Sequence, residues 1–173
     1  QTVTSAGSRL LENYLASPER DLVEIYRRQS CVGEFAQAPS AVEEVSSILK
    51  SGSDLERILG RLRNRLVRPR ELGGLRSTIR GLPGVSRCLL ALGERFPAIF
   101  EIAQRVQTFE ELCAVLDRAL EEELPADIKV DVKGEGGRVI RVGYDSEFDQ
   151  LRELGSGGKR WILELEASER EKT

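Results

Sequence analysis

Apolar residues recur three and four positions apart along most of this chain, which is the spacing of one face of an α-helix. The first such run comprises Leu10, Leu11, Tyr14 and Leu15. We expect further helices over residues 21–35, 40–50, 54–62, 69–80, 85–92, 97–106 and 108–124. The pattern therefore predicts a bundle of helices over residues 1–124.

Helix start signals support these assignments. In a capping box, the side-chain oxygen of the first residue accepts a hydrogen bond from a backbone N–H of the first helical turn. The side chain of a glutamate three residues later accepts a hydrogen bond from the backbone N–H of that first residue. Four boxes fit this description: Asp21–Glu24, Ser40–Glu43, Ser53–Glu56 and Thr108–Glu111. Pro69 suits the first position of a helix, and we expect the run Gly81-Leu82-Pro83-Gly84 to end that helix.

The hydrophobic period changes between residues 125 and 144. Ile128, Val130 and Val132 alternate with charged residues, and glycines follow at 134, 136 and 137. Alternation is typical of extended backbone. We expect a Gly-rich extended connector here, or a small hairpin with residues 139–142 as the second strand.

A helical period returns from Asp145 to the end of the chain. Its apolar positions are Phe148, Leu151, Leu154, Ile162 and Leu165, with Trp161 beside them. We expect this face to pack on the earlier helices and Trp161 to be buried, because an apolar stripe left in water is unfavourable. Glycines at 155, 157 and 158 predict a bend.

The predicted fold is thus all-α, a single domain over residues 1–173. It has a bundle at 1–124, an extended connector at 125–144 and the start of a long helix at 145–173. The last helix still runs at Thr173 without a stop signal, and the chain contains no Met. We therefore expect a fragment of a longer protein.

Composition narrows the possible functions. The 173 residues are 40% hydrophobic and 32% charged, with a formal net charge of −3 and no apolar run as long as a membrane span. The absence of His removes His-based acid–base catalysis and most zinc sites. Cys31, Cys88 and Cys113 are few and widely spaced, as expected of reduced thiols in an intracellular, reducing compartment.

Three short motifs resemble functional sites but are better explained without one. Gly155–Lys159 resembles a phosphate-binding loop, but Glu153 and Arg160 stand where that loop needs Gly and Ser or Thr. Glu121–Glu123 is better explained as a solvated helix end than as a metal site. Phe109-Glu110-Glu111 is better explained as a helix start than as a base-reading motif. We expect no catalytic residue, no metal and no cofactor in this chain.

The remaining candidate is a run of arginines. Residues 57–95 hold ten arginines and no lysine against two glutamates, in a chain whose net charge is −3. Arg57, Arg61, Arg65 and Arg68 are three or four apart, so we expect them to share a helix face. Arginine favours two-pronged contacts to carboxylate or phosphate. Three interpretations stay open: a solvated face, a docking surface for another domain or subunit, and contact with DNA phosphates.

Two stretches resemble a known family. The pattern Gly136-Gly137-x-Val139-Ile140-Arg141-x-Gly143-Tyr144-Asp145-x-Glu147-x-Asp149, followed by Leu151-Arg152, is similar to the core and lever region of the MutS family of DNA mismatch repair proteins. Thr2 to Pro18 resembles the start of the same core, and Asp54-Leu55-Glu56-Arg57 and Pro69-Arg70 match it in the middle. Ala6, Tyr14 and Ser30 depart from the family's usual Met, Trp and Asp.

The resemblance implies a mechanical role. The chain would be the core and the start of the lever of a mismatch repair ATPase, coupling a clamp that holds double-stranded DNA to an ATPase domain that dimerises. ATP and Mg would belong to the parent protein, as would contacts with the clamp, ATPase and connector domains, in the cytoplasm or nucleoid. The alternative is a free-standing helical adaptor that binds proteins through its arginine face.

Overall fold

The computed structural model describes residues 2–127, 138–155 and 157–158. The fold is all-α, as predicted. The named helices are α1 (Ser5–Ala16), α2 (Leu22–Ala36), α3 (Pro39–Lys50), α4 (Leu55–Arg63), α5 (Pro69–Leu90), a 3-10 turn η1 (Gly93–Arg95), α6 (Pro97–Arg105) and α7 (Glu110–Ala119). They form two compact units, one of residues 1–67 and 74–113 and the other of residues 68–73 and 114–173.

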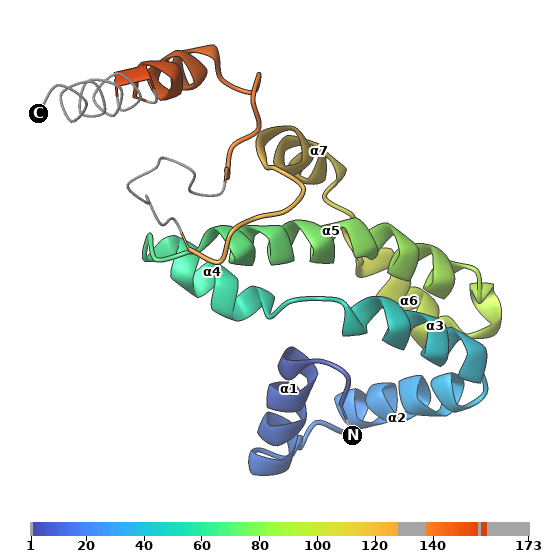
Figure 1. Cartoon of the computed structure of the whole chain (residues 1–173). Helices are drawn as coiled ribbons and strands as arrows, with labels where there is room; N and C mark the ends of the chain where they lie inside the picture. Colours follow the sequence, from blue (N-terminus) through green and yellow to red (C-terminus); the bar gives the residue numbers. More distant parts are fainter. Residues whose placement is uncertain (1, 128–137, 156, 159–173) are drawn as a thin grey trace, which may run out of the picture. The chain divides into compact units, whose positions relative to one another are not determined.

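The core of the first unit is formed by the end of α2, by α3, by the second half of α5 and by α6 (Figure 1). Its most deeply buried side chain is Ile99, which is 0% exposed. The core members are Ala38, Ala41, Val85, Cys88, Leu89, Phe96, Ile99 and Ala103. Ala38, Ala41 and Ala103 are its small members, and they share the cluster with larger side chains as a close-packed interior requires.

A glutamate on α2 fixes the start of α6. Glu34 accepts hydrogen bonds from the backbone N–H groups of Ala98 at 3.1 Å and of Ile99 at 2.8 Å. Both donors lie in the first turn of α6, where helix N–H groups have no partner within the helix. A side chain 64 residues earlier in the sequence therefore caps α6 and joins it to α2.

The prediction that residues 81–84 end a helix was wrong, because α5 continues through them to Leu90 with Pro83 inside it. The reason is tertiary packing. A Cβ atom at Gly81 would lie 3.0 Å from Ile48 Cγ2, and one at Gly84 would lie 3.2 Å from Ile48 Cδ1. These glycines let α3 approach α5 closely, and α3 and α4 follow one another along α5 in Figure 1.

The capping boxes were predicted with mixed success. Asp21 caps α2 by accepting the Val23 N–H at 3.0 Å, as expected. The other three helices begin at different residues. Pro39 occupies the first turn of α3 after Ala38, Asp54 and not Ser53 caps α4, and α7 starts at Glu110 after Phe109. Proline presets the helical φ angle and needs no N–H partner, which explains the earlier start of α3.

In the second unit, α7 is followed by a short pairing with residues 139–141. Leu120 and Ile140 form an antiparallel bridge, with hydrogen bonds from the Arg141 N–H to the Ala119 carbonyl at 2.8 Å and from the Glu121 N–H to the Val139 carbonyl at 3.0 Å. Helix 108–124 was therefore predicted too long: it ends at Ala119, where this pairing takes over the backbone hydrogen bonds. Residues 128–137, the other half of the expected hairpin, lie outside the described residues.

The helix after Asp145 is present, and Asp145 caps it by accepting the Phe148 N–H at 2.9 Å. Residues 146–155 and 157–158 are helical. Phe148, Leu151 and Leu154 are exposed in the described part of this helix, so the packing of its apolar face on the earlier helices stays a prediction. Trp161, Ile162 and Leu165 lie outside the described residues, so their burial stays a prediction.

Candidate functional site

Helix α4 carries the first of the predicted arginines and is anchored at its start by charge. Asp54 accepts the Arg57 N–H at 3.2 Å, and Arg9 of α1 donates to the same carboxylate at 2.7 and 2.8 Å. Arg9 also donates to Glu56 at 2.6 Å. These hydrogen bonds with Arg9 hold the pKa of Asp54 well below its usual value and raise the pKa of Arg9.

The end of α4 has the hydrogen bonds of a Schellman motif. The Leu66 N–H donates to the Arg61 carbonyl at 2.8 Å, and the Arg65 N–H donates to the Leu62 carbonyl at 3.0 Å. Arg65 takes the position that usually belongs to glycine, with φ +56°. The Arg61 guanidinium donates to the Leu66 carbonyl at 2.7 Å and ties the turn back to the helix.

The four predicted arginines do not share one helix face. Arg57 and Arg61 lie on α4, which ends at Arg63, whereas Arg65 lies in the turn after it. Arg68 belongs to the second unit, where its guanidinium lies 3.8 Å from Asp127. The predicted shared face was wrong because α4 ends at Arg63 and Arg65 adopts a left-handed conformation in the turn that follows. Whether these arginines dock a partner stays a prediction.

Sequence reasoning missed the leucines beside these arginines. Leu59 is 52% exposed, Leu62 43% and Leu66 63%. Leu62 and Arg63 lie three and four residues after Leu59, so each of them is a neighbour of Leu59 on the surface of α4. We call Leu59, Leu62, Arg63, Arg65 and Leu66 the α4 surface. The sequence did carry a signal, because leucine and arginine are interspersed from Leu59 to Leu66. A helix face that packs into a core has few arginines, so this mixture indicates an exposed surface with apolar side chains.

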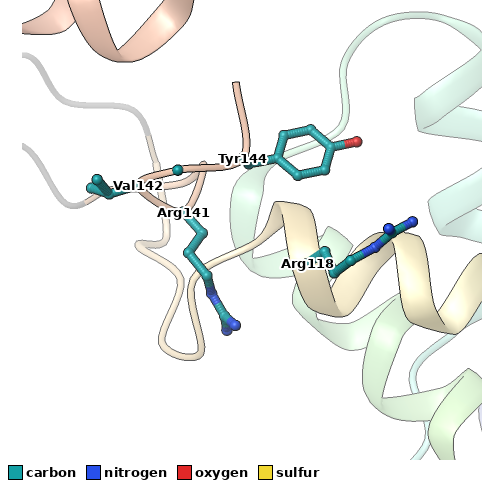
Figure 2. Close-up of a pocket in the computed structure, with 5 residues that line it drawn as sticks. Arg118, Arg141, Val142 and Tyr144 are labelled. Carbon is teal, nitrogen blue, oxygen red and sulfur yellow. The ribbon is translucent and has the colours of Figure 1, made fainter. Parts of the chain in front are cut away.

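A hollow of about 520 Å³ in the second unit is lined by Arg118, Arg141, Val142, Gly143 and Tyr144. The Leu120–Ile140 bridge places α7 next to this turn, and Gly143 adopts φ +85°. Figure 2 shows the Arg118 and Arg141 side chains extending in different directions. Because their guanidinium groups do not converge on one point, this hollow lacks the arrangement that would hold a single anion.

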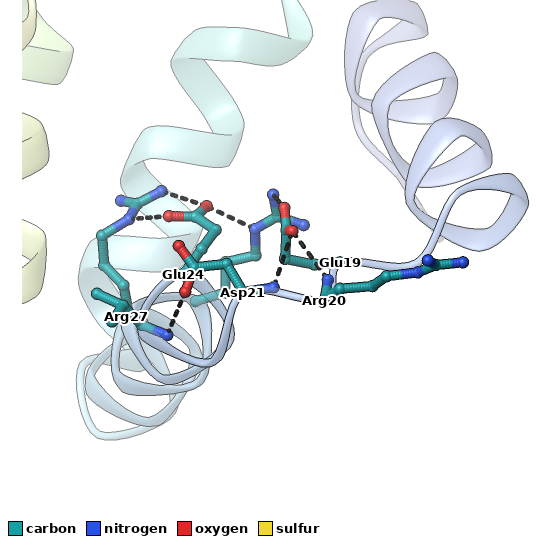
Figure 3. A network of polar contacts seen from close by, with 7 residues as sticks. Glu19, Arg20, Asp21, Glu24 and Arg27 are labelled. Carbon is teal, nitrogen blue, oxygen red and sulfur yellow. Dashed lines mark hydrogen bonds and ion pairs between the residues drawn. The ribbon is translucent and has the colours of Figure 1, made fainter.

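A network of charges between α1 and α2 is structural in character (Figure 3). Glu24 accepts hydrogen bonds from Arg27 at 2.7 and 2.8 Å and from Arg28 at 2.7 Å. These hydrogen bonds lower the pKa of Glu24 from 4.5 to about 2, and the bond with Arg27 has the largest effect. Arg28 also stacks over the Tyr14 ring at 4.0 Å. The network links α1 to α2.

The described residues show little that suggests reaction chemistry. Within them, no three His, Cys, Asp or Glu side chains gather as a metal ion would require, and no helix is both long and apolar enough to cross a bilayer. The three cysteines are free thiols, and burial raises the pKa of Cys31 and Cys88. Lys159 of the glycine–lysine cluster lies outside the described residues.

Comparison with known proteins gives the family. The model for MutS domain III matches residues 1–171. The chain is 38% identical over 175 residues to the DNA mismatch repair protein MutS of Methanothrix thermoacetophila. That alignment covers 100% of this chain and 20% of the relative, so the chain spans about a fifth of the relative's length. Together with the all-α fold, these matches show that the chain belongs to the MutS domain III family.

Proposed function

We propose that this chain is the helical core of a longer MutS-like DNA mismatch repair protein and that it relays conformational change between a DNA-holding clamp and an ATPase domain. The observation that carries the proposal is the match of MutS domain III to residues 1–171 in a chain that spans 20% of a MutS relative. The parent is a mismatch repair ATPase that uses ATP and Mg, binds double-stranded DNA and works as a dimer inside the cell. This chain performs no chemical step.

The structure supports a mechanical role through its helix connections. Helix α5 has 22 residues, about 33 Å at 1.5 Å per residue, and contributes residues to both units. The Glu34 cap joins α2 to α6, and the buried cluster around Ile99 joins both helices to α3 and α5. Packed helices with directional caps move as rigid bodies, which is the property a relay between distant domains requires.

The isolated chain and the full-length protein should differ in a defined way. The 173-residue chain should show no saturable ATP binding by calorimetry and only weak, salt-sensitive DNA binding, without preference for a mismatched duplex. The full-length protein should hydrolyse ATP and prefer the mismatch. A preference for mismatched DNA in the isolated chain would contradict the proposal.

The free-standing adaptor is the second candidate, and the exposed leucines and arginines of α4 are what favours it. The parent gene distinguishes the two. A mismatch-reading domain with a Phe-x-Glu motif upstream and a Walker-type ATPase downstream support the repair protein. Start and stop codons directly at the two ends of this chain support the adaptor.

A further inference from the structure

The α4 surface combines exposed leucine with exposed arginine in a short segment. Between Arg57 and Leu66 there are four arginines and no acidic residue, in a chain of net charge −3. Arg63 and Arg65 are exposed, and the structure records no ion pair for either of them among the residues it describes. The three leucines between and beside them are 43% to 63% exposed. Among the residues that the structure describes, an apolar and a cationic surface are therefore both exposed at one end of α4.

The conformation of Arg65 gives an independent indication. At φ +56° its Cβ crowds the neighbouring backbone, a conformation that costs a non-glycine residue about 1–2 kcal/mol. Glycine would close the same Schellman motif without this strain. An exposed arginine that keeps a strained position, beside two exposed leucines, is more consistent with a role for its charge than with helix termination alone.

We propose that the α4 surface is a docking site for an acidic segment with aliphatic side chains, located in another part of the same MutS-like polypeptide. The leucines would be buried against the aliphatic side chains, and Arg63 and Arg65 would pair with carboxylates at the rim. This inference rests on the proposed function, because that function places about four fifths of the polypeptide outside this chain, as the 20% coverage of the relative indicates.

A protein partner fits these residues better than DNA does. Duplex phosphates are bound by cationic and polar groups, and contact with them would not bury the three exposed leucines. Residues 57–66 also contain no aromatic side chain on which an unpaired base would stack. Alternating leucine and arginine offers an apolar centre with a charged rim, the usual composition of a protein interface.

Site-specific crosslinking in the full-length protein tests the proposal. Leu59 is replaced by p-benzoyl-phenylalanine, the protein is irradiated with mismatched DNA and ATP present, and crosslinked peptides are identified by mass spectrometry. We expect crosslinks to an acidic segment outside this chain. The double variant Arg63→Glu, Arg65→Glu should reduce their yield at least tenfold, whereas Arg20→Glu, an exposed arginine between α1 and α2, should leave it unchanged.

Mixing isotopically light and heavy protein identifies the source of each crosslinked peptide. Light–light and heavy–heavy pairs alone support the proposal, whereas light–heavy pairs show a second copy and overturn it. Crosslinks to DNA, or none above the background of an unirradiated sample, overturn it as well. Arg65→Gly is the folding control: it should preserve the fold and still lower the crosslink yield.

The same protein separates this inference from the proposed function. If a substitution in the helical core lowers mismatch-stimulated ATP hydrolysis but Leu59 gives no crosslink to an acidic segment, the docking site is wrong and the relay stands. If the segment is captured but hydrolysis does not depend on the core, the relay is wrong.

Discussion

Removal of the Glu34 side chain on α2 should loosen α6, because this side chain holds the start of that helix. Glu34→Ala deletes the acceptor for two backbone N–H groups, on Ala98 and Ile99, at 3.1 and 2.8 Å. Loss of a helix cap costs about 0.5–2 kcal/mol, and a hydrogen bond to a charged group contributes about 1.5–3 kcal/mol. Because Glu34 is only half buried, water replaces part of this interaction. We expect a loss of about 1–2 kcal/mol in the free energy of unfolding.

Urea unfolding of the 173-residue chain at 25 °C measures this loss, and hydrogen exchange of the Ala98 and Ile99 amides locates it. Glu34→Gln keeps one acceptor oxygen and should cost about half as much. Glu12→Ala, an exposed glutamate on α1, is the matched control and should change stability by less than about 0.5 kcal/mol. If Glu34→Ala unfolds at the wild-type urea concentration and both amides keep their protection, the cap contributes nothing and the reasoning is refuted.

Three further predictions concern stability. Ile99→Ala should cost about 2–5 kcal/mol by urea unfolding, because the side chain is 0% exposed and leaves a cavity; a loss below 1 kcal/mol would show a loosely packed core. The Glu24 carboxylate has a lowered pKa, so its contribution to stability is complete above pH 4.5 and is lost as the pH falls toward about 2. Glu24→Gln should flatten that part of the stability curve, and an unchanged curve would contradict the network. Arg65→Gly should raise the melting temperature by about 1–4 °C, since relief of strain exceeds the added backbone entropy; a lower melting temperature would show that Arg65 is not strained.

Local signals allowed much of the helix content to be predicted, including the Asp21 cap of α2, the helix that begins after Asp145 and the first position of α5 at Pro69. The errors arose where distant residues decide the outcome. Gly81 and Gly84 have the composition of a helix stop, but they lie under Ile48 of α3. No local pattern identifies Glu34 as the cap of a helix 64 residues away.

The candidate site was predicted only in part. The arginine run was visible in the sequence, but α4 ends at Arg63, so Arg65 and Arg68 lie outside the helix that carries Arg57. The exposure of Leu59, Leu62 and Leu66 depends on which surfaces the rest of the chain covers. A helical spacing of apolar residues does not show whether another helix covers them. For the same reason Phe148 and Leu151 have the pattern of core residues and yet are exposed.

The central claim is that this core relays change between DNA and ATPase, and the ratio of mismatch-stimulated to basal ATP hydrolysis in the full-length protein tests it most directly. Glu34→Ala weakens the α2–α6 connection, and Glu12→Ala serves as its control. The relay predicts that Glu34→Ala lowers this ratio at least severalfold while basal hydrolysis and affinity for mismatched DNA stay near wild type. An unchanged ratio in a variant whose α6 amides exchange faster would contradict it.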